Sequence, residues 1–409
     1  MNEILGHDAK WQALQRAFAR GQVPQTLLIS GPAHTGKWTL ARRYAQLLLC
    51  PNAQTGDEST LDGPLPEPCG TCRVCHQIEI ESFPDFRVYR PTVSATNKQS
   101  APEELDSSTI AIEQARSFFD EALYRPTNGP RKVMVLVQAD RMNLQAQNAL
   151  LKTFEEPVNG VSLFLLTDQP QKLLSTVRSR CWELRLGLVS DARIRSWLHT
   201  QFPAAQSTLL DEATRAAAGR PGAAWRELSR LNEAEGEQTS RFRQVMMLVD
   251  RIQKSSPVGA LGLTESALQM ADAWGDEDRT NDLKIDGERS EAEGKKVGRI
   301  LVRSQIARLL DELTNAYRAH WLESLHLENL QREGRPVVAK APLAPPAVWG
   351  IGLDQIRKTR QYILRNANTN LALDVLFGQL IAAQHQAQQS ARRPSSREGE
   401  VNRRGLHMI

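Results

Sequence analysis

Apolar runs alternate with helix-like stretches through the first half of the chain. Continuous apolar runs bounded by turn residues predict buried strands at 26–30 (TLLIS), 86–90, 133–137, 162–167 and 182–186. Helical periodicity lies between them, most clearly at 112–123 and 145–156. Strand–helix alternation of this kind predicts an α/β fold, a parallel sheet that is covered by helices on both faces.

A helix is predicted ahead of the first strand. Trp11, Leu14 and Phe18 recur at helical spacing and share one face. Asp8 is placed to cap this helix and Gly21 to end it.

The pattern becomes purely helical from about residue 191. An apolar stripe in the last third, at three- and four-residue intervals, comprises Val302, Ile306, Leu309, Leu313 and Tyr317. The acidic segment 275–294 and the proline-rich segment 334–346 are predicted as loops, and the tail from about residue 386 has too little apolar content to pack. Arginines in this tail could contact nucleic acid, although a solvated tail explains them as well.

These patterns predict three domains and a disordered tail. The predicted parts are an α/β domain (1–187) with a cysteine insertion (50–75), a small helical lid domain (188–231), an all-α C-terminal domain (232–385) and the tail (386–409).

Composition narrows the class of protein. The 409 residues are 41% hydrophobic and 24% charged, as in a globular protein, and the net charge of +4 does not by itself indicate a nucleic-acid binder. The N-terminus is charged, and no window approaches the roughly 18 apolar residues of a membrane span. We therefore expect a cytoplasmic protein with no membrane partner, in which cysteines bind metal or stay as thiols.

Four of the five cysteines form a cluster in the sequence. Cys50, Cys69, Cys72 and Cys75 have the pattern C-x18-C-x2-C-x2-C, which predicts a tetrahedral Zn²⁺ site. Four thiolates leave no open coordination position, so the zinc is expected to be structural. His76 is an alternative ligand. The negative charges of the flanking Glu67, Glu79 and Glu81 disfavour contact of this module with nucleic acid.

The stretch GPAHTGKW (31–38) resembles a phosphate-binding loop up to its last residue. Gly31, Gly36 and Lys37 match G-x-x-x-x-G-K between a predicted strand and helix, where backbone N–H groups and the lysine hold phosphates. Trp38 replaces the hydroxyl residue that binds Mg²⁺. The hydroxyl of Thr39 comes one residue late and is expected to point about 100° away around the helix.

The acidic pair that completes a magnesium site is also missing. At the end of the predicted strand 133–137, the corresponding positions are Val137 and Gln138. Asp140 lies past the strand end, and a shifted loop that makes it the catalytic acid remains an alternative. We expect no Mg²⁺ site and little or no hydrolysis, while binding of ATP or ADP stays open.

Together these motifs resemble the bacterial clamp-loader subunits, AAA+ proteins of the DNA polymerase III gamma and delta prime type. The resemblance rests on GPAHTGK, the four-cysteine insertion, QNALLKTFEEP (147–157), STVRSRC (175–181) and, near the C-terminus, ILRNANTNLALDVL (363–376). It is strongest up to about residue 230. The chain lacks both the hydroxyl residue of the loop and the acidic pair, and in this it resembles the delta prime type, which does not act as a motor.

The resemblance implies roles for particular residues. Arg180 in the SRC motif would reach the nucleotide of a neighbouring subunit as an arginine finger, with Arg178 as a rival. Arg220 falls where the family has a second nucleotide sensor, and an ordinary turn explains it equally well. Cys181 is expected to be a buried thiol. Glu155 or Glu156 could meet a neighbouring subunit, although Lys152 and Glu156, spaced i, i+4, also suit a surface ion pair.

The implied partners are gamma/tau-type and delta-type subunits in a hetero-oligomeric ring, in which the helical C-terminal domain forms a collar. Through this complex the chain would contact the sliding clamp and primed DNA. The complex is part of the DNA polymerase III holoenzyme, a DNA-directed DNA polymerase and hence a nucleotidyltransferase. Its implied location is the bacterial nucleoid. Two other functions stay open, an active clamp-loader ATPase and a zinc-ribbon nucleic-acid protein. Magnesium-dependent turnover distinguishes the first, and steeply salt-dependent DNA binding the second.

Overall fold

Contacts within the chain divide it into two units, residues 1–234 and 235–409. The structure is a computed structural model that describes residues 4–53, 65–91, 110, 112–155, 158–233, 241–256, 259–282, 291–332, 344–365 and 367–392. The predicted domain boundaries at 187, 231 and 385 stay predictions. Among the residues that the structure describes, no helix is long and apolar enough to cross a membrane.

The first unit is built around a parallel sheet. Its elements are α1 (Asp8–Ala19), β1 (Thr26–Ser30), α2 (Lys37–Leu49), α3 (Arg73–Glu79), β2 (Phe86–Tyr89), α4 (Ile112–Ala122), β3 (Lys132–Leu136), the 3₁₀ turn η1 (Ala139–Arg141), α5 (Leu144–Glu155), β4 (Val161–Thr167), the 3₁₀ turn η2 (Pro170–Lys172), α6 (Ser175–Arg178), β5 (Trp182–Arg185), α7 (Asp191–Gln201), α8 (Ser207–Ala217) and α9 (Pro221–Glu233). The five strands lie in the order β2-β3-β4-β1-β5, and every paired strand is parallel. The predicted strands agree with these to within one residue at either end, so the expected α/β fold is confirmed.

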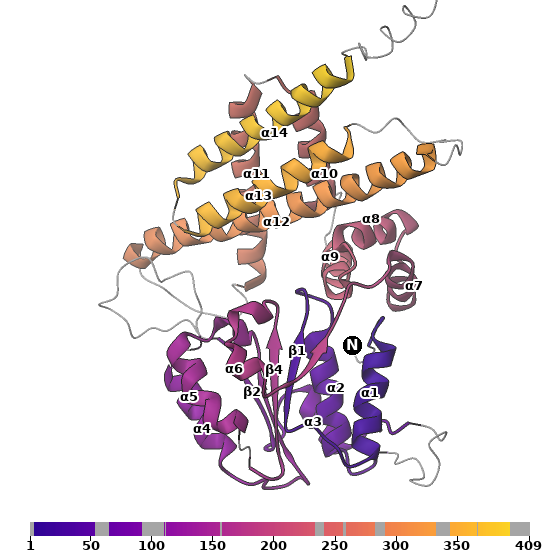
Figure 1. The fold of residues 1–409 in the computed structure, drawn as a ribbon, viewed down its shortest axis with the longest axis vertical. Helices are drawn as coiled ribbons and strands as arrows, with labels where there is room; N and C mark the ends of the chain where they lie inside the picture. The colour runs from indigo at the N-terminus through magenta and orange to yellow at the C-terminus, as the bar shows by residue number, and fades with distance from the viewer. Residues whose placement is uncertain are drawn as a thin grey trace, which may run out of the picture. The chain divides into compact units, whose positions relative to one another are not determined.

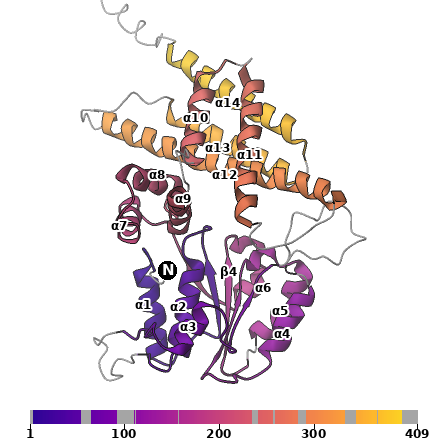
Figure 2. The ribbon, with the colours of Figure 1, turned by 180° about the vertical axis from the view of Figure 1, so that it is seen from behind.

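Helices cover both faces of the sheet, with α1, α2 and α3 on one side and α4 and α5 on the other (Figures 1 and 2). Successive strand residues point to opposite faces. Leu27 and Ile29 of β1 accordingly belong to the apolar cluster under α2, while Leu28 belongs to the cluster under α4 and α5. All three side chains are fully buried, as the continuous apolar run predicted.

The cap expected for the first helix is wrong in detail. The N-cap of α1 is His7, and Asp8 is the first helical residue. The Asp8 carboxylate does not cap a backbone N–H because it accepts a hydrogen bond from Arg193 of α7 at 2.8 Å. Gly21 follows the helix with a φ of 65°, consistent with the predicted end.

Three helices, α7 to α9, follow the sheet and enclose a small core. Ile194, Trp197, Leu210 and Leu228 are buried there against one another. The purely helical pattern predicted from about residue 191 is confirmed, because β5 is the last strand among the described residues.

The second unit is helical throughout its described part. It comprises α10 (Arg241–Lys254), α11 (Ala260–Asp282), α12 (Glu291–Arg332), α13 (Pro346–Leu364) and α14 (Thr369–Arg392). Its core includes four members of the predicted stripe, namely Ile306, Leu309, Leu313 and Tyr317, while the side chain of Val302 lies outside the described residues. Gly352 of α13 lies against the Tyr317 ring, where an added Cβ would come within 2.5 Å of it.

Both helix ends around the acidic segment extend into the predicted loop. Helix α11 continues to Asp282 and α12 begins at Glu291, so the loop prediction for 275–294 is wrong at both ends, and 283–290 lie outside the described residues. Acidic residues were read as a loop signal, but Glu291 and Glu293 fall in the first turn of α12, where the helix dipole favours negative charge.

Two further predicted boundaries meet helices. Helix α13 begins at Pro346, the last residue of the proline-rich segment, and proline suits a first helical turn. Helix α14 continues to Arg392, beyond the residue at which the disordered tail was predicted to start. Residues 333–343 and 393–409 lie outside the described residues.

Candidate functional site

The loop between β1 and α2 has the backbone that its glycines predict. Gly31 has a φ of 147° and Gly36 a φ of 95°, and an added Cβ on Gly31 would lie 2.4 Å from the Leu186 carbonyl oxygen. Helix α2 begins directly after Gly36, at Lys37. The motif therefore occupies the strand–loop–helix position in which phosphate-binding loops are found.

The Lys37 side chain turns back into this loop. Its Nζ donates to the carbonyl oxygens of Gly31 at 2.8 Å and Pro32 at 2.6 Å. It also lies 2.5 Å from Oδ1 of Asp168, which directly follows β4. Lys37 is buried, and the Thr35 hydroxyl donates to the same Pro32 carbonyl. The sequence analysis identified Lys37 but not Asp168.

Trp38 occupies the position of the missing hydroxyl and packs away from the loop. Its ring lies 6.3 Å from the Phe86 ring of β2, and the Arg90 guanidinium covers it at 5.1 Å from the ring centroid. Two hydrogen bonds from Arg90 to Glu81, at 2.5 and 2.7 Å, hold that guanidinium in place. The partly buried indole thus packs against the hydrophobic core beside β2 and offers no ligand to a metal.

The end of β3 offers no carboxylate at the predicted positions. Val137 packs against the same apolar cluster as Trp38, and its N–H donates to the Tyr89 carbonyl at 2.9 Å, which continues the ladder with β2. Gln138 turns the chain with a φ of 54°. Val137 therefore serves packing and Gln138 serves the turn, at the two positions where the sequence has no acidic residue.

Asp140 lies in η1 and faces the end of β4. Its Oδ1 accepts from the Thr167 hydroxyl at 2.8 Å and from the Asp168 N–H at 3.3 Å. This carboxylate therefore organises the segment that carries Asp168. The catalytic role of Asp140 that was raised as an alternative stays a prediction.

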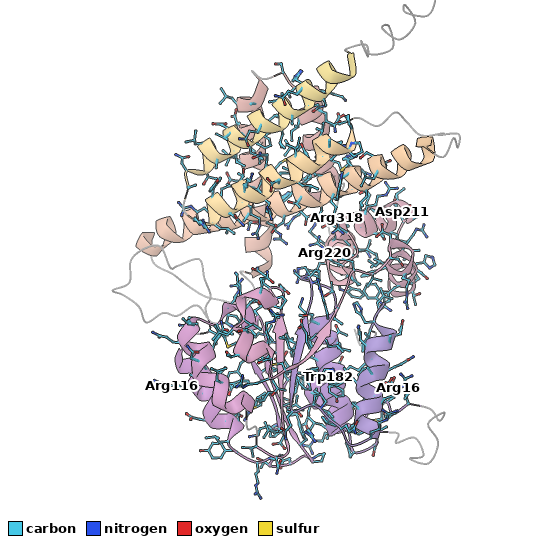
Figure 3. The ribbon with its side chains drawn as sticks, viewed as in Figure 1. Arg16, Arg116, Trp182, Asp211, Arg220 and Arg318 are labelled. Carbon is cyan, nitrogen blue, oxygen red and sulfur yellow. The ribbon has the colours of Figure 1, made fainter. Side chains whose placement is uncertain are left out.

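The three-helix segment contacts the loop at its middle residue. His34 has a φ of 63°, its carbonyl accepts from the Gly222 N–H at 2.9 Å, and its Nδ1 lies 2.9 Å from Nη2 of Arg226. Arg220, labelled in Figure 3, donates from Nε to the Ala217 carbonyl at 2.8 Å. This contact is that of a helix-terminal turn, and a nucleotide-sensing role of Arg220 stays a prediction.

The four predicted cysteines come together at the other end of α2. Cys50 caps α2, Cys72 caps α3 and Cys75 lies within α3, and their sulfurs and that of Cys69 all lie within 4.8 Å of one another. The Cys50 Sγ is 3.5 Å from the Cys69 Sγ and 3.8 Å from the Cys72 Sγ. Zinc–sulfur bonds of about 2.3 Å in a tetrahedron place sulfurs about 3.8 Å apart, so the donor set fits Zn²⁺.

Backbone N–H groups point at the two half-buried sulfurs, those of Cys69 and Cys72. The Cys72 N–H points to the Cys69 Sγ and the Cys75 N–H to the Cys72 Sγ, each at 3.4 Å. The Thr71 N–H, followed by that of Cys72, lowers the pKa of the Cys69 thiol to about 6, whereas burial raises the pKa of Cys50 and Cys75. The lowered pKa of Cys69 favours its thiolate form, which is the form that binds a metal, and a bound cation would favour the thiolate forms of Cys50 and Cys75 as well.

Two other candidate ligands stay outside this cluster. The His76 side chain is exposed. Cys181 is half-buried and donates to the Val177 carbonyl at 3.2 Å, and burial raises the pKa of its thiol to about 12. The group of possible metal ligands found among the described residues contains only the four cysteines named above.

Glu67 attaches the cysteine segment to α1 and α2. Its Oε1 accepts from Trp11 Nε1 at 2.7 Å and from Gln15 Nε2 at 2.9 Å, and its Oε2 accepts from Arg43 Nη2 at 2.9 Å. The Arg43 guanidinium also lies over the Trp11 ring at 5.2 Å. The sequence analysis treated Glu67 only as a flanking negative charge, whereas it is the centre of a docking contact.

Arg180 lies between α6 and β5 with an exposed side chain. Its Nη1 donates to the Thr176 carbonyl at 2.8 Å. Arg178, the rival finger, is also exposed, as is Trp182 at the start of β5 (Figure 3). The side chains of residues 152–157 in the QNALLKTFEEP stretch lie outside the described residues, so their predicted roles stay predictions.

Comparison with known proteins finds relatives of the first unit. A family model described as "DNA polymerase III, delta subunit" matches residues 6–189. This stretch of the chain is similar to that family. It contains the loop, the cysteine cluster and the SRC motif, and the predicted resemblance to clamp-loader subunits is confirmed.

Curated relatives include subunits of more than one kind. The chain is 31% identical to the DNA polymerase III subunit delta′ of Pseudomonas aeruginosa over 202 residues, 49% of this chain and 55% of that subunit. It is 29% identical to the delta′ subunit of Escherichia coli over 214 residues, 52% of this chain and 57% of that one. The tau subunit of E. coli is 31% identical over 197 residues, 48% of this chain and 27% of tau. The chain thus spans about half the length of the delta′ relatives, and identity alone does not distinguish delta′ from tau.

Among solved structures, a DNA polymerase III gamma subunit-related protein of Thermotoga maritima matches 92% of this chain and 99% of its own chain. The identity is 14% and the TM-score 0.34, too low to support an argument about the fold.

Proposed function

We propose that this chain is a delta prime-like clamp-loader subunit of the DNA polymerase III complex. It helps to load the sliding clamp onto primed DNA, in a ring with gamma/tau-type and delta-type subunits. It does not hydrolyse ATP itself, and it presents Arg180 to the nucleotide site of a neighbouring subunit. The family match and the delta′ and tau relatives support membership of such a complex.

The observation that carries the non-motor role is the packing of Trp38 and Val137. Both stand where a motor needs a magnesium ligand, and both contact the hydrophobic cluster beside β2. A hydrolytic site needs the metal to bridge the phosphates and to neutralise charge in the transition state. With an indole clamped by Arg90 in that position, we expect the loop to bind a nucleotide weakly and not to cleave it.

Arg180 suits the role of a finger for another chain's site. Its side chain is exposed and follows a short helix, α6, whose Val177 is fully buried and anchors the turn. A guanidinium keeps its charge and can bridge two phosphate oxygens. Arg178 shares the exposure, so the two arginines form a matched pair for mutagenesis.

An active ATPase is the second candidate, because Lys37 is retained and tau is among the relatives. It requires a metal ligand that reaches the loop. Asp140 is the nearest carboxylate past β3, and its Oδ1 is already hydrogen-bonded to Thr167 and Asp168. We therefore favour the non-motor function.

For the cysteine cluster we propose a structural Zn²⁺ ion, held by Cys50, Cys69, Cys72 and Cys75. Bound zinc would join the end of α2 to α3 and keep the buried thiols ionised. This role explains the close approach of the four sulfurs. It also requires no open coordination position.

The test is DNA-stimulated ATP hydrolysis by a loader reconstituted from this chain and its partner subunits. Arg180→Ala is expected to lower turnover at the neighbouring site by about 10²-fold or more, as loss of an arginine finger does. Arg178→Ala is the matched control and is expected to retain most of the activity. Equal activity of the Arg180→Ala and unmodified loaders would rule out the finger.

A further inference from the structure

The phosphate-binding lysine of the loop has its hydrogen-bonding capacity already filled. An ammonium group has three N–H donors. The Nζ of Lys37 has three oxygen partners, the carbonyls of Gly31 and Pro32 and the Oδ1 of Asp168, at 2.8, 2.6 and 2.5 Å. A phosphate can therefore bind Lys37 only by displacing at least one of them.

Asp168 is the partner that resembles a phosphate, since it alone carries negative charge. The register of the sheet pairs Ser30 with Thr167, so the loop after β1 and the residue after β4 lie at the same edge. The Asp168 side chain is 34% exposed, and that of Lys37 is 9% exposed. An ion pair this sheltered is weakened less by salt than a surface pair.

A second carboxylate keeps Asp168 in this place. The Oδ1 of Asp140 accepts from the Thr167 hydroxyl and from the Asp168 N–H, at 2.8 and 3.3 Å. Thr167 is 1% exposed, so the hydroxyl has little access to water as an alternative partner. The end of β4 is thereby fixed from η1, and Asp168 is presented towards Lys37.

We propose that Asp168 is an internal anion that occupies Lys37 and competes with the phosphates of a nucleotide. In the closed state the carboxylate takes the position of a phosphate next to the ammonium group, and it repels any phosphate that approaches the loop. The affinity of the loop for nucleotide is then set by the fraction of molecules in which this contact is open. The inference rests on the proposed function only in taking the ligand to be a nucleotide.

The experiment is a titration of the full-length chain with the fluorescent nucleotide mant-ADP. If the contact is closed in about nine molecules of ten, the apparent Kd is about tenfold above its intrinsic value. Asp168→Asn keeps the shape and removes the charge, and it is expected to lower the Kd about tenfold. Adding Lys37→Ala to this variant is expected to abolish the gain.

Asp211→Asn is the control, because it removes a carboxylate of α8 that pairs with Arg195 and not with Lys37. All three oxygen partners of Lys37 are kept in this variant, so the Kd is expected to stay within about twofold. An Asp168→Asn chain with an unchanged Kd, with no detectable binding, or with a gain no larger than that of Asp211→Asn would overturn the proposal. Asp168→Ala replaces Asp168→Asn if the latter unfolds below the unmodified chain in a thermal scan.

These outcomes do not depend on the partner subunits. A failure of the Arg180 experiment with a tighter Asp168→Asn chain would contradict the proposed role in the complex and leave the internal anion intact. The reverse combination would contradict the internal anion alone.

Discussion

The loop and the cysteine cluster lie at opposite ends of one helix, α2, which begins at Lys37 and is capped by Cys50. They differ in whether all the side chains needed to bind a metal ion are present. The cluster has four sulfurs within 4.8 Å of one another. The loop has its glycines and its lysine, while the partly buried Trp38 and Val137 pack against the hydrophobic core at the positions where metal ligands are expected.

The two ends of α2 are therefore expected to bind different ligands, a metal ion at the cysteine cluster and phosphates at the loop. The cluster can satisfy a metal ion completely and so can contribute to folding. The loop has the backbone N–H groups that could hold phosphates, but Trp38 and Val137 stand at the positions where we expect metal ligands in a motor subunit. If the proposed function holds, one end of α2 serves stability through a metal ion and the other end binds a nucleotide without cleaving it.

The largest expected effect comes from removing the metal. Cys75→Ser should abolish zinc binding and lower the free energy of unfolding by something on the order of 5 kcal/mol, because loss of a structural metal is among the most damaging changes to a domain. Metal content after denaturation and chemical unfolding of the full chain measure the two effects. Cys181→Ser is the control and should keep its zinc. Full stability of a zinc-free Cys75→Ser chain would contradict the comparison.

A smaller effect is expected where the cysteine segment docks onto α1 and α2. Glu67→Ala removes the acceptor shared by Trp11, Gln15 and Arg43 and should lower the free energy of unfolding by about 1–2 kcal/mol.

Zinc content should stay unchanged in this variant, because none of the four sulfurs is altered. Glu265→Ala, at an exposed position on α11, is the matched control and should have little effect. Loss of zinc from the Glu67→Ala chain would mean that docking and metal binding form one unit.

Features encoded by neighbours in sequence could be predicted. The strand at 26–30 was recognisable because its burial on both faces leaves a continuous apolar run. The cysteine cluster was recognisable because three of its ligands lie within one tight segment. Both signals are local, and both survived comparison with the structure.

Features that depend on strand order could not be predicted. Asp168 lies 131 residues after Lys37 in the sequence (168 − 37), and the β1–β4 pairing brings the two together. The Arg90 guanidinium over Trp38 likewise depends on where β2 ends. A carboxylate directly after an apolar strand was a usable signal for Asp168, since loops at the carboxyl ends of parallel strands share one edge. That Lys37 is the partner of Asp168 could not be predicted from the sequence.

The central claim is that the loop of this chain has no working metal site, and ATP hydrolysis by the purified chain with Mg²⁺ tests it most directly. The comparison variant is Lys37→Ala, which removes the phosphate-binding lysine and reveals contaminating activity. The account predicts that the unmodified chain and Lys37→Ala show the same background rate, with or without Mg²⁺. Magnesium-dependent hydrolysis that disappears in Lys37→Ala would contradict it and show that this subunit is a motor.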